Sequence, residues 1–414
     1  MGDFLMPRIA YLANQFPSPV EPYVVEEILQ LRRHGLEVVA SSARKTKRDD
    51  QLWSGGEILT IQPLRFSVLI RAAWLGLHRI SPLRALFHRV VRQGQERVPT
   101  RIRALAHTLL GLYYAALLQN RGLQHIHVHH GYFSSWIAMV AARALGIGFS
   151  MTLHGSDLLL HNAYIDTKLD ACQFCFTISE FNRQYIRHAY PSVDLRKVVV
   201  QRLGVSLESQ IGSSEAAGGK SFVILAVGRL HMVKDHAFLV RACREFRDRG
   251  NQFLCLIAGH GPEQHALEQQ IHALGLDQQV RLLGHLSRED LASYYAMADV
   301  VVLTSRSEGI PLVLMEAMAQ GRVVLAPAIT GIPELVIDGQ TGFLYRAGSL
   351  DDFVARLESI LESISTLEPV RREARRHVSE HFNREKNLDQ FQKTFLSRVN
   401  TAPESRTHAH SVLQ

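Results

Sequence analysis

The stretch 300–321 constrains the fold of this chain most strongly. Residues 300–303, Val-Val-Val-Leu, form an apolar run that is typical of a strand buried on both faces of a sheet. A polar loop with Gly309 follows, and Pro311 suits the first position of a helix because it has no N–H to leave unpaired there. Good helix formers continue to Gln320. The stretch therefore predicts a strand, a loop at its carboxyl end and then a helix.

Two carboxylates mark this unit. Glu308 lies on the loop, and Glu316 lies within the helix. Between them, the N–H groups at the helix start form a ready site for an anion, which the helix dipole also favours. Each acid alone is usually a helix cap or a solvated surface group. Glu316, however, stands among apolar residues, where an unpaired carboxylate would be costly to bury, so we expect it to have a partner.

The run Glu308-Gly-Ile-Pro-Leu-Val-Leu-Met-Glu316-Ala resembles the donor-binding motif of retaining glycosyltransferases of family 4. The resemblance extends over residues 7–400 and implies an α/β fold of the GT-B type, with two Rossmann-like doubly wound domains facing a central cleft. It also implies roles. Glu308 would hold the transferring sugar and steady developing positive charge, and Glu316 would bind the ribose diol of a nucleoside diphosphate sugar.

A second motif of the same resemblance begins where the strand 222–227 ends. Gly228-Arg229-Leu-His-Met-Val-Lys234 places a cation pair after a glycine turn, and such a pair can bind a diphosphate, Lys as a point charge and Arg as a fork. A surface Arg and Lys at this spacing are otherwise commonplace. The family usually has glycine after the lysine, where this chain has Asp235.

Two further turns complete the expected donor site. Gly259 and Gly261 follow the strand 253–258 and would let the backbone approach a nucleotide. His285 and Leu286 follow the strand 280–284 and resemble residues that line a base pocket. The expected donor-binding residues are Gly228, Gly259, Gly261, His285, Leu286, Gly309, Ile310, Pro311, Leu312, Val313 and Glu316.

The N-terminal part predicts a parallel sheet of its own. A strand at 8–14, a helix at 21–33 and a strand at 36–40 form a βαβ unit. The loop between the first two contains Phe16-Pro and Glu21, and it resembles the exopolysaccharide-assembly subgroup of the family. That resemblance places Phe16 and Glu21 on the acceptor side of the site.

Histidines gather near the next strand end. His125, His127 and His129 alternate along one strand, so they would share a face. A metal site is conceivable there, but the resemblance supplies another account, a histidine-rich strand end, and we expect no metal. His154-Gly-Ser-Asp157 then follows the strand 150–153, at the end where open α/β sheets bind ligands. Resemblance makes His154 a contact to the donor sugar and puts Asp157 on the acceptor side.

The boundaries follow from these motifs and from composition. We expect an N-terminal acceptor-binding Rossmann-like domain over 1–205 and a Gly- and Ser-containing linker over 206–220. The C-terminal nucleotide-sugar-binding domain covers 221–382. By resemblance, a last helix over 383–400 crosses back to the first domain, and the polar tail 401–414 is expected to be disordered.

Positive charge is concentrated in one window. The chain has a formal net charge of +7, yet the window 58–156 holds eleven arginines and a single acid, Glu96. Residues 64–118 of this window are mostly helical by pattern, with breaks expected at Pro82 and Pro99. Core helices with a solvated basic face and an interfacial surface for anionic lipid both explain the charge. Nucleic acid is not supported, since no aromatic platform or helix-turn-helix pattern accompanies the arginines.

Composition bounds the setting. The 46% apolar and 21% charged content is that of a globular protein, and no spanning helix or signal peptide is read. Four cysteines do not suggest a disulfide scaffold. We therefore expect a cytoplasmic protein that is peripheral on the inner face of the membrane if the basic window contacts lipid.

The expected function is implied by the resemblance. It is retaining transfer of a sugar from a nucleoside diphosphate sugar to an acceptor hydroxyl, on a glycan or lipid-linked glycan of surface polysaccharide synthesis. Glu308, Lys234, Arg229 and His154 would be catalytic. Cations and helix amides would oppose the charge of the departing diphosphate, so no metal cofactor is expected. The alternatives are a non-catalytic partner that binds a sugar nucleotide, and a nucleotide-sugar epimerase on the same fold.

Overall fold

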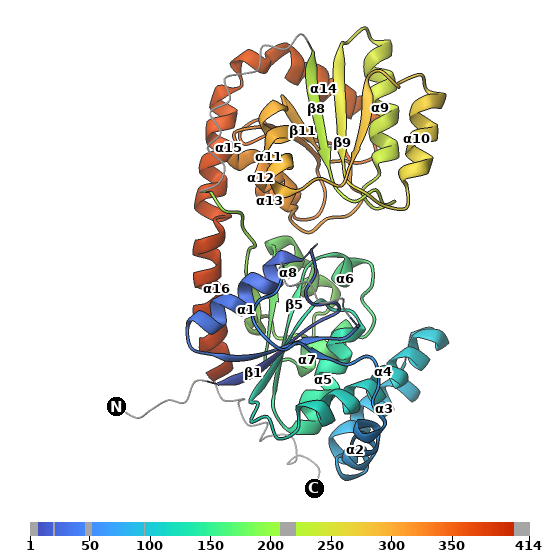
Figure 1. The fold of residues 1–414 in the computed structure, drawn as a ribbon, viewed down its shortest axis with the longest axis vertical. Coiled ribbons are helices and arrows are strands. Elements are labelled where there is room, and N and C mark those ends of the chain that lie inside the picture. The colour runs from blue at the N-terminus through green and yellow to red at the C-terminus, as the bar shows by residue number, and fades with distance from the viewer. Residues whose placement is uncertain (1–6, 20, 46–51, 95, 208–220, 401–414) are drawn as a thin grey trace. The chain divides into compact units, whose positions relative to one another are not determined.

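The computed structural model describes residues 7–19, 21–45, 52–94, 96–207 and 221–400. Within these residues the chain divides into two compact units (Figure 1). The first contains the chain up to Ile178, residues 183–201 and the residues from Leu388 onward. The second contains residues 179–182 and 202–387. Most of the expected linker, residues 208–220, and the expected tail, residues 401–414, lie outside the described residues.

The first unit is built on a seven-stranded parallel sheet with the order β3-β2-β1-β4-β5-β6-β7. Its strands are β1 (Arg8–Ala13), β2 (Glu37–Ser42), β3 (Leu59–Thr60), β4 (His125–His129), β5 (Gly148–Leu153), β6 (Phe174–Thr177) and β7 (Val198–Val200). Successive side chains of β1 enter opposite cores. Ile9 and Tyr11 pack on one face, while Ala10 and Leu12 pack on the other.

Helices cover both faces of this sheet (Figure 1). They are α1 (Pro22–Arg33), α2 (Phe66–His78), α3 (Ile80–Val91), α4 (Val98–Leu118), α5 (Phe133–Leu145), α6 (Ser156–Leu159), α7 (Ile165–Ala171), α8 (Glu180–Ala189), the 3-10 turn η1 (Leu195–Lys197) and α16 (Arg384–Asn400). α1 and the Phe391 and Phe395 side chains of α16 share one core. α2 to α5 supply the other, with Trp136 at its centre.

The second unit has a six-stranded parallel sheet with the order β10-β9-β8-β11-β12-β13. The strands are β8 (Phe222–Val227), β9 (Phe253–Ala258), β10 (Val280–Gly284), β11 (Val300–Val302), β12 (Val323–Pro327) and β13 (Phe343–Tyr345). The helices are α9 (His236–Asp248), α10 (Gln264–Ala273), α11 (Arg288–Met297), α12 (Leu312–Ala319), α13 (Ile332–Leu335), α14 (Leu350–Ser363), η2 (Ile364–Thr366) and α15 (Glu368–His381). Here too the strand side chains alternate between two cores, with Ile224 in one and Leu225 in the other.

Both sheets are doubly wound, as the sequence predicts. The strand order reverses direction between β1 and β4 in the first unit and between β8 and β11 in the second. In open α/β sheets, ligands bind outside the carboxyl ends of the strands at such a reversal. The loops after β8 and β11 are therefore the place to look for a ligand site in the second unit.

Two local expectations differ from the structure. Pro311 is the N-cap of α12, one residue before the helix, instead of its first residue. The break among the early helices falls at Arg79, while Pro82 lies inside the first turn of α3. Proline is tolerated in a first turn because the N–H it lacks would have no intrahelical partner. None of the helices that the structure describes combines the length and apolar composition of a membrane span.

Candidate active site

The loops after β8 and β11 are joined to each other in the second unit. The backbone N–H of Arg306 donates to the carbonyl of Val233 at 2.8 Å, and the Thr304 hydroxyl donates to the carbonyl of Lys234 at 2.9 Å. Arg306 Nε also lies 2.7 Å from Asp235 Oδ2. Contacts of the backbone and of side chains thus hold the two loops in a fixed register.

This register brings Lys234 and Glu308 together. Lys234 Nζ lies 2.5 Å from Glu308 Oε1, and their side chains are 24% and 12% exposed. The Glu308 backbone is held in turn, because the Thr330 hydroxyl donates to its carbonyl at 2.7 Å. The expected cation and the expected sugar-binding acid therefore form an ion pair at the edge where the strand order reverses. Arg229 is exposed on the same loop as Lys234.

Glu316 has the partner that its apolar surroundings require. It is half-buried on α12, and the buried Tyr295 of α11 donates its hydroxyl to Glu316 Oε2 at 3.0 Å. Burial and the neighbouring Glu316 carboxylate hold the pKa of Tyr295 well above its ordinary value. Tyr295 therefore stays a hydrogen-bond donor at physiological pH.

The start of α12 offers backbone donors. Pro311 is the N-cap and, among the described residues, no side chain caps the helix. The first N–H groups of a helix have no intrahelical acceptor, and the helix dipole makes this end attractive to anions. Gly309, Ile310, Leu312 and Val313, all expected donor-site residues, surround this helix start.

The loop glycines lie against protein backbone. A Cβ on Gly259 would lie 1.8 Å from the carbonyl oxygen of Gly228, and one on Gly261 would lie 2.3 Å from that of Leu230. The loop after β9 is thus packed onto the loop after β8. The carbonyl of Gly284 accepts a hydrogen bond of 2.8 Å from the Gly259 N–H. The turn before His285 and Leu286 therefore adjoins the loop after β9.

The first unit holds His154 in a buried polar network. His154 Nε2 lies 2.9 Å from Nδ1 of His129, and its ring stacks on Tyr23 at 4.9 Å between centroids. Burial, followed by the charges of His130 and His129, lowers the pKa of His154 well below its usual range. The carboxylate of Asp157 accepts from the N–H groups of Gly155 at 2.7 Å and His154 at 3.1 Å, which fixes the turn.

A charged triad lies beside that turn. His130 Nε2 is 2.9 Å from Glu21 Oε1, and its Nδ1 is 3.7 Å from Asp157 Oδ2. Burial would lower the pKa of His130, but the neighbouring carboxylates of Asp157 and Glu21 outweigh it and raise the pKa to about 9. His130 is therefore an imidazolium between two carboxylates. It pairs the two expected acceptor-side acids, Glu21 and Asp157, through a residue that the sequence did not single out.

The histidine strand contains one group with metal-ligand spacing. The ligand atoms of Glu27, His127 and His129 lie within 4.8 Å of one another. Protein groups already engage them, because His127 contacts Ser150 and Thr152 through its two nitrogens and His129 Nε2 lies 2.8 Å from Glu27. These contacts form a hydrogen-bonded network within the core.

Phe16 lies deeper than an acceptor contact would require. Its side chain is 1% exposed and meets Trp53 edge-on at 4.9 Å between centroids. Its N–H donates to the Ser42 hydroxyl at 3.1 Å. In this structure Phe16 supports the loop after β1 from within the core.

The loops after β8 and β11 carry the residues expected to bind the donor and are called the donor loops. Comparison with known proteins relates these loops to a family. Residues 210–377 match the family model described as glycosyl transferases group 1. This part of the chain therefore resembles a group 1 glycosyltransferase domain. The match includes the loops that carry Arg229, Lys234, Glu308 and Glu316.

Curated relatives resemble the same part of the chain. The proposed colanic acid biosynthesis glycosyltransferase WcaL of Salmonella typhimurium is 32% identical over 196 residues, which is 46% of this chain and 48% of WcaL. The amylovoran biosynthesis glycosyltransferase AmsK of Erwinia amylovora is 32% identical over 193 residues, 45% of this chain and 47% of AmsK. The matches thus span about half the length of these two relatives.

Solved structures share the fold over nearly the whole chain. Anabaena Alr3699/HepE in complex with UDP has a TM-score of 0.70 at 19% identity, over 94% of this chain and 100% of that one. Sucrose-phosphate synthase of Thermosynechococcus elongatus has a TM-score of 0.74 at 18% identity, over 94% and 98%. The chain therefore has a GT-B fold, as the sequence predicts, and the match to the group 1 model covers the larger part of its second unit.

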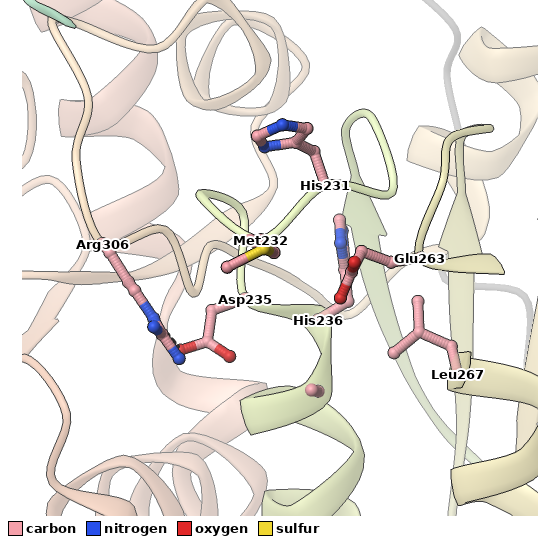
Figure 2. A pocket seen from close by; sticks show the side chains of 8 residues that line it. His231, Met232, Asp235, His236, Glu263, Leu267 and Arg306 are labelled. Carbon is pink, nitrogen blue, oxygen red and sulfur yellow. Dashed lines mark hydrogen bonds and ion pairs between the residues drawn. The ribbon is translucent and has the colours of Figure 1, made fainter. Parts of the chain in front are cut away.

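A cavity of about 250 Å³ lies among the loops after β8, β9 and β11 of the second unit (Figure 2). It is lined by His231, Met232, Asp235, His236, Ala237, Glu263, Leu267 and Arg306. Figure 2 shows the Asp235–Arg306 pair on one side and Glu263 and Leu267 on the other. Burial lowers the pKa of His236 to about 4, so this cavity has a neutral imidazole at its wall at physiological pH.

Sequence reasoning missed three residues around the expected site. Tyr295, Arg306 and His130 each contact a predicted residue from another element. Arg306 and His130 stand within stretches that the sequence singled out but were given no role there, and Tyr295 stands outside them. Only the apolar setting of Glu316 and the glycine-to-aspartate change at Asp235 hinted that such contacts exist.

Proposed function

We propose that the protein transfers a sugar from a nucleoside diphosphate sugar to an acceptor hydroxyl with retention of anomeric configuration. The observation that carries the proposal is the Lys234–Glu308 ion pair beside the uncapped start of α12. A cation, an acid and free helix amides converge there on a group 1 glycosyltransferase domain. The same combination suits an anionic leaving group joined to a sugar.

The leaving group determines what the cations do. As the glycosidic bond breaks, the diphosphate gains negative charge, and donors placed in advance stabilise that charge most effectively. Lys234, Arg229 and the amides near Leu312 would supply these donors. With them in place we propose that no divalent metal is required, so a chelator should leave turnover unchanged.

Glu308 and Lys234 would exchange partners when the donor binds. Without donor, the two side chains neutralise each other at 2.5 Å. A diphosphate competes for Lys234 and leaves Glu308 to hold sugar hydroxyls and steady the developing positive charge. Glu316, already fixed by Tyr295, would accept hydrogen bonds from the ribose diol. By resemblance, His154 would contact the sugar.

The acceptor side rests on the relatives. WcaL and AmsK carry names from exopolysaccharide synthesis, and Alr3699/HepE was solved with UDP. We therefore propose a glycan or lipid-linked glycan as acceptor, in surface polysaccharide synthesis at the cytoplasmic face of the membrane. Glu21 and Asp157, held by His130, would lie on the acceptor side.

A two-step experiment tests this function. A thermal-shift panel of nucleoside diphosphate sugars identifies the donor, and incubation with that donor then measures hydrolysis or transfer. We expect donor consumption, and a product whose anomeric proton coupling matches the configuration of the donor. An inverted product would reject retention. Binding without donor consumption would indicate a non-catalytic partner, and an epimerised nucleotide sugar would indicate an epimerase.

A further inference from the structure

The helix α2 is apolar on two opposite sides. Val68, Ala72 and Leu75 are buried against the first unit. On the other side the stripe Phe66, Leu69, Ile70, Trp74 and Leu77 is exposed. At the α-helical repeat these five residues occupy an arc of about 140°. A helix that is apolar all round is ordinarily enclosed, so the exposed side of α2 lacks a covering partner among the described residues.

The exposure is large and local. Phe66 is 78%, Trp74 54% and Leu77 74% exposed. Eleven of the sixteen large hydrophobic side chains that are exposed in the described chain lie between Leu64 and Leu109. Leu64 precedes α2, and the other five stand on α3 and α4, which Figure 1 shows beside α2 in a lobe of the first unit: Phe87, Val91, Val98, Ile102 and Leu109. Exposed apolar side chains gathered on neighbouring helices mark an interaction surface.

Arginines accompany this apolar surface. Exposed arginine side chains stand on or next to the same helices: Arg65, Arg79, Arg84, Arg92, Arg97 and Arg103. The one acid of the window, Glu96, already receives hydrogen bonds from Arg89 at 2.9 and 3.1 Å. The surface is therefore both apolar and positively charged, and the one acid of the window is already paired.

We infer that the exposed stripe of α2, with the arginines of α2 to α4, docks on an anionic lipid surface. An amphipathic helix of this kind lies in the membrane plane with its apolar side among the acyl chains and its cations at the headgroups. Trp74 suits the boundary between the two regions. A second copy of this chain fits poorly, because two such faces would bring arginine against arginine.

Flotation with lipid vesicles tests the inference without donor or acceptor. We expect the wild-type protein to float with vesicles of phosphatidylcholine and phosphatidylglycerol, and to remain at the bottom with phosphatidylcholine alone. Binding should weaken as salt is raised, because screening reduces the attraction of the arginines. No flotation with either vesicle, or equal flotation with both, would overturn the proposal.

Paired variants locate the contact. Trp74→Ser with Leu77→Ser removes apolar area, and Arg79→Glu with Arg84→Glu reverses charge; each pair should reduce vesicle binding roughly tenfold or more. The matched controls are Met297→Ser and Arg372→Glu, exposed residues of the second unit, which should float like wild type. Equal loss in the controls, or no loss in the α2 and α3 variants, would refute the assignment.

Two further measurements keep this inference separate from the transferase proposal. Donor consumption in solution should be the same for all four variants, since none lies on a donor loop, and this shows that they fold. Size-exclusion chromatography then tests the other occupant. A wild-type dimer that Trp74→Ser with Leu77→Ser converts to a monomer, with no vesicle binding, would assign the surface to a second copy instead of lipid.

Discussion

Lys234 has two negative partners in the proposed reaction. One is present in the structure, where its ammonium lies 2.5 Å from the Glu308 carboxylate. The other is the departing diphosphate. Because the ion pair is partly buried, neither group pays the full cost of leaving water when the donor arrives. The site is thus preorganised for a charge that develops only during bond cleavage.

Lys234→Ala should lower turnover by two to three powers of ten, about 2.7–4 kcal/mol of transition-state stabilisation, because it removes a donor to the leaving group. Steady-state kinetics at saturating donor measures the effect. Lys393→Ala, on an exposed lysine of α16, is the control and should retain full turnover. Wild-type turnover in a folded Lys234→Ala protein would remove this residue from the mechanism.

Asp235 performs two tasks at the position where the family usually has glycine. It adopts a positive φ of 47°, which aspartate tolerates better than most residues, and caps α9 by accepting from the N–H of Phe238 at 3.2 Å. Its second oxygen holds Arg306 at 2.7 Å. The pair therefore ties the Lys234 loop to the Glu308 loop.

Arg306→Ala should weaken donor binding about three- to tenfold while changing the free energy of unfolding by less than about 1 kcal/mol, since an exposed ion pair contributes little to stability. Arg306→Lys should restore most of the binding. Isothermal titration calorimetry with the donor, together with chemical denaturation, separates the two effects. Unchanged donor affinity would show that the pair does not position the loops.

At the scale of single residues, the sequence predicted that Glu316 has a partner but not which residue that partner is. The apolar neighbours of Glu316 predicted that it has a partner, and Tyr295 confirms this. Tyr295 itself could not be identified, because it reaches Glu316 from another helix, and no local pattern encodes that meeting. For Phe16 the burial itself could not be predicted, since a Phe-Pro loop does not reveal that Trp53 will cover the ring.

The loops after β8 and β9 behave as one packed element. The Leu230 carbonyl accepts from the N–H of Glu263 at 3.0 Å, and Gly259 and Gly261 provide the space for this approach. The sequence suggested that these glycines admit a nucleotide. In the structure they admit the neighbouring loop, so they act first on the shape of the donor site.

Gly261→Ala should destabilise the protein by about 1–3 kcal/mol, because the new Cβ would meet the Leu230 carbonyl at 2.3 Å and the backbone must shift. Thermal or chemical unfolding measures the loss. Gly228→Ala is the matched control for stability, since its Cβ would make only ordinary contacts, the nearest at 3.7 Å. Equal stability of the two variants would contradict the tight packing.

Helices and strands could be predicted where the spacing of apolar residues agreed with their place between turns. The alternation of strands and helices gave both parallel sheets, and the apolar run at 300–303 contains β11. The stretch between β3 and β4 was correctly predicted to be helical. Pro82 did not mark the break between helices, because it lies in the first turn of α3, where the N–H that proline lacks would have no intrahelical partner. Which side of α2 would remain exposed needed the structure, since both sides are apolar.

At the scale of the whole molecule, charged side chains of the first unit lie in two kinds of surroundings, exposed and buried. On α2 to α4 the charge stays at the surface, while at the carboxyl ends of β4 and β5 it is buried in the triad of Glu21, His130 and Asp157. Lys168 lies nearby, with its Nζ 2.6 Å from the Gly131 carbonyl; burial lowers its pKa to about 7, although Asp157 and Asp166 oppose this. The stability of the first unit should therefore depend on pH.

His130 should stabilise the folded protein at lower pH. Its folded pKa of about 9 lies above the unfolded value near 6.5, so its contribution is complete below about pH 6.5 and is lost as pH rises through about 9. The difference in unfolding free energy between wild type and His130→Gln should shrink over this window. Lys168 shifts stability in the opposite direction there, but it is common to both proteins and cancels. A pH-independent difference would contradict the imidazolium assignment.

The helices α2 to α4 occupy one uninterrupted stretch between β3 and β4, while the donor loops lie in a separate stretch that begins after β8. If α2 to α4 dock on lipid as proposed, exchange of the first stretch between relatives would alter the surface to which the protein binds and would leave the loops after β8 and β11 untouched. A single recombination event could therefore move the same chemistry from one cellular surface to another.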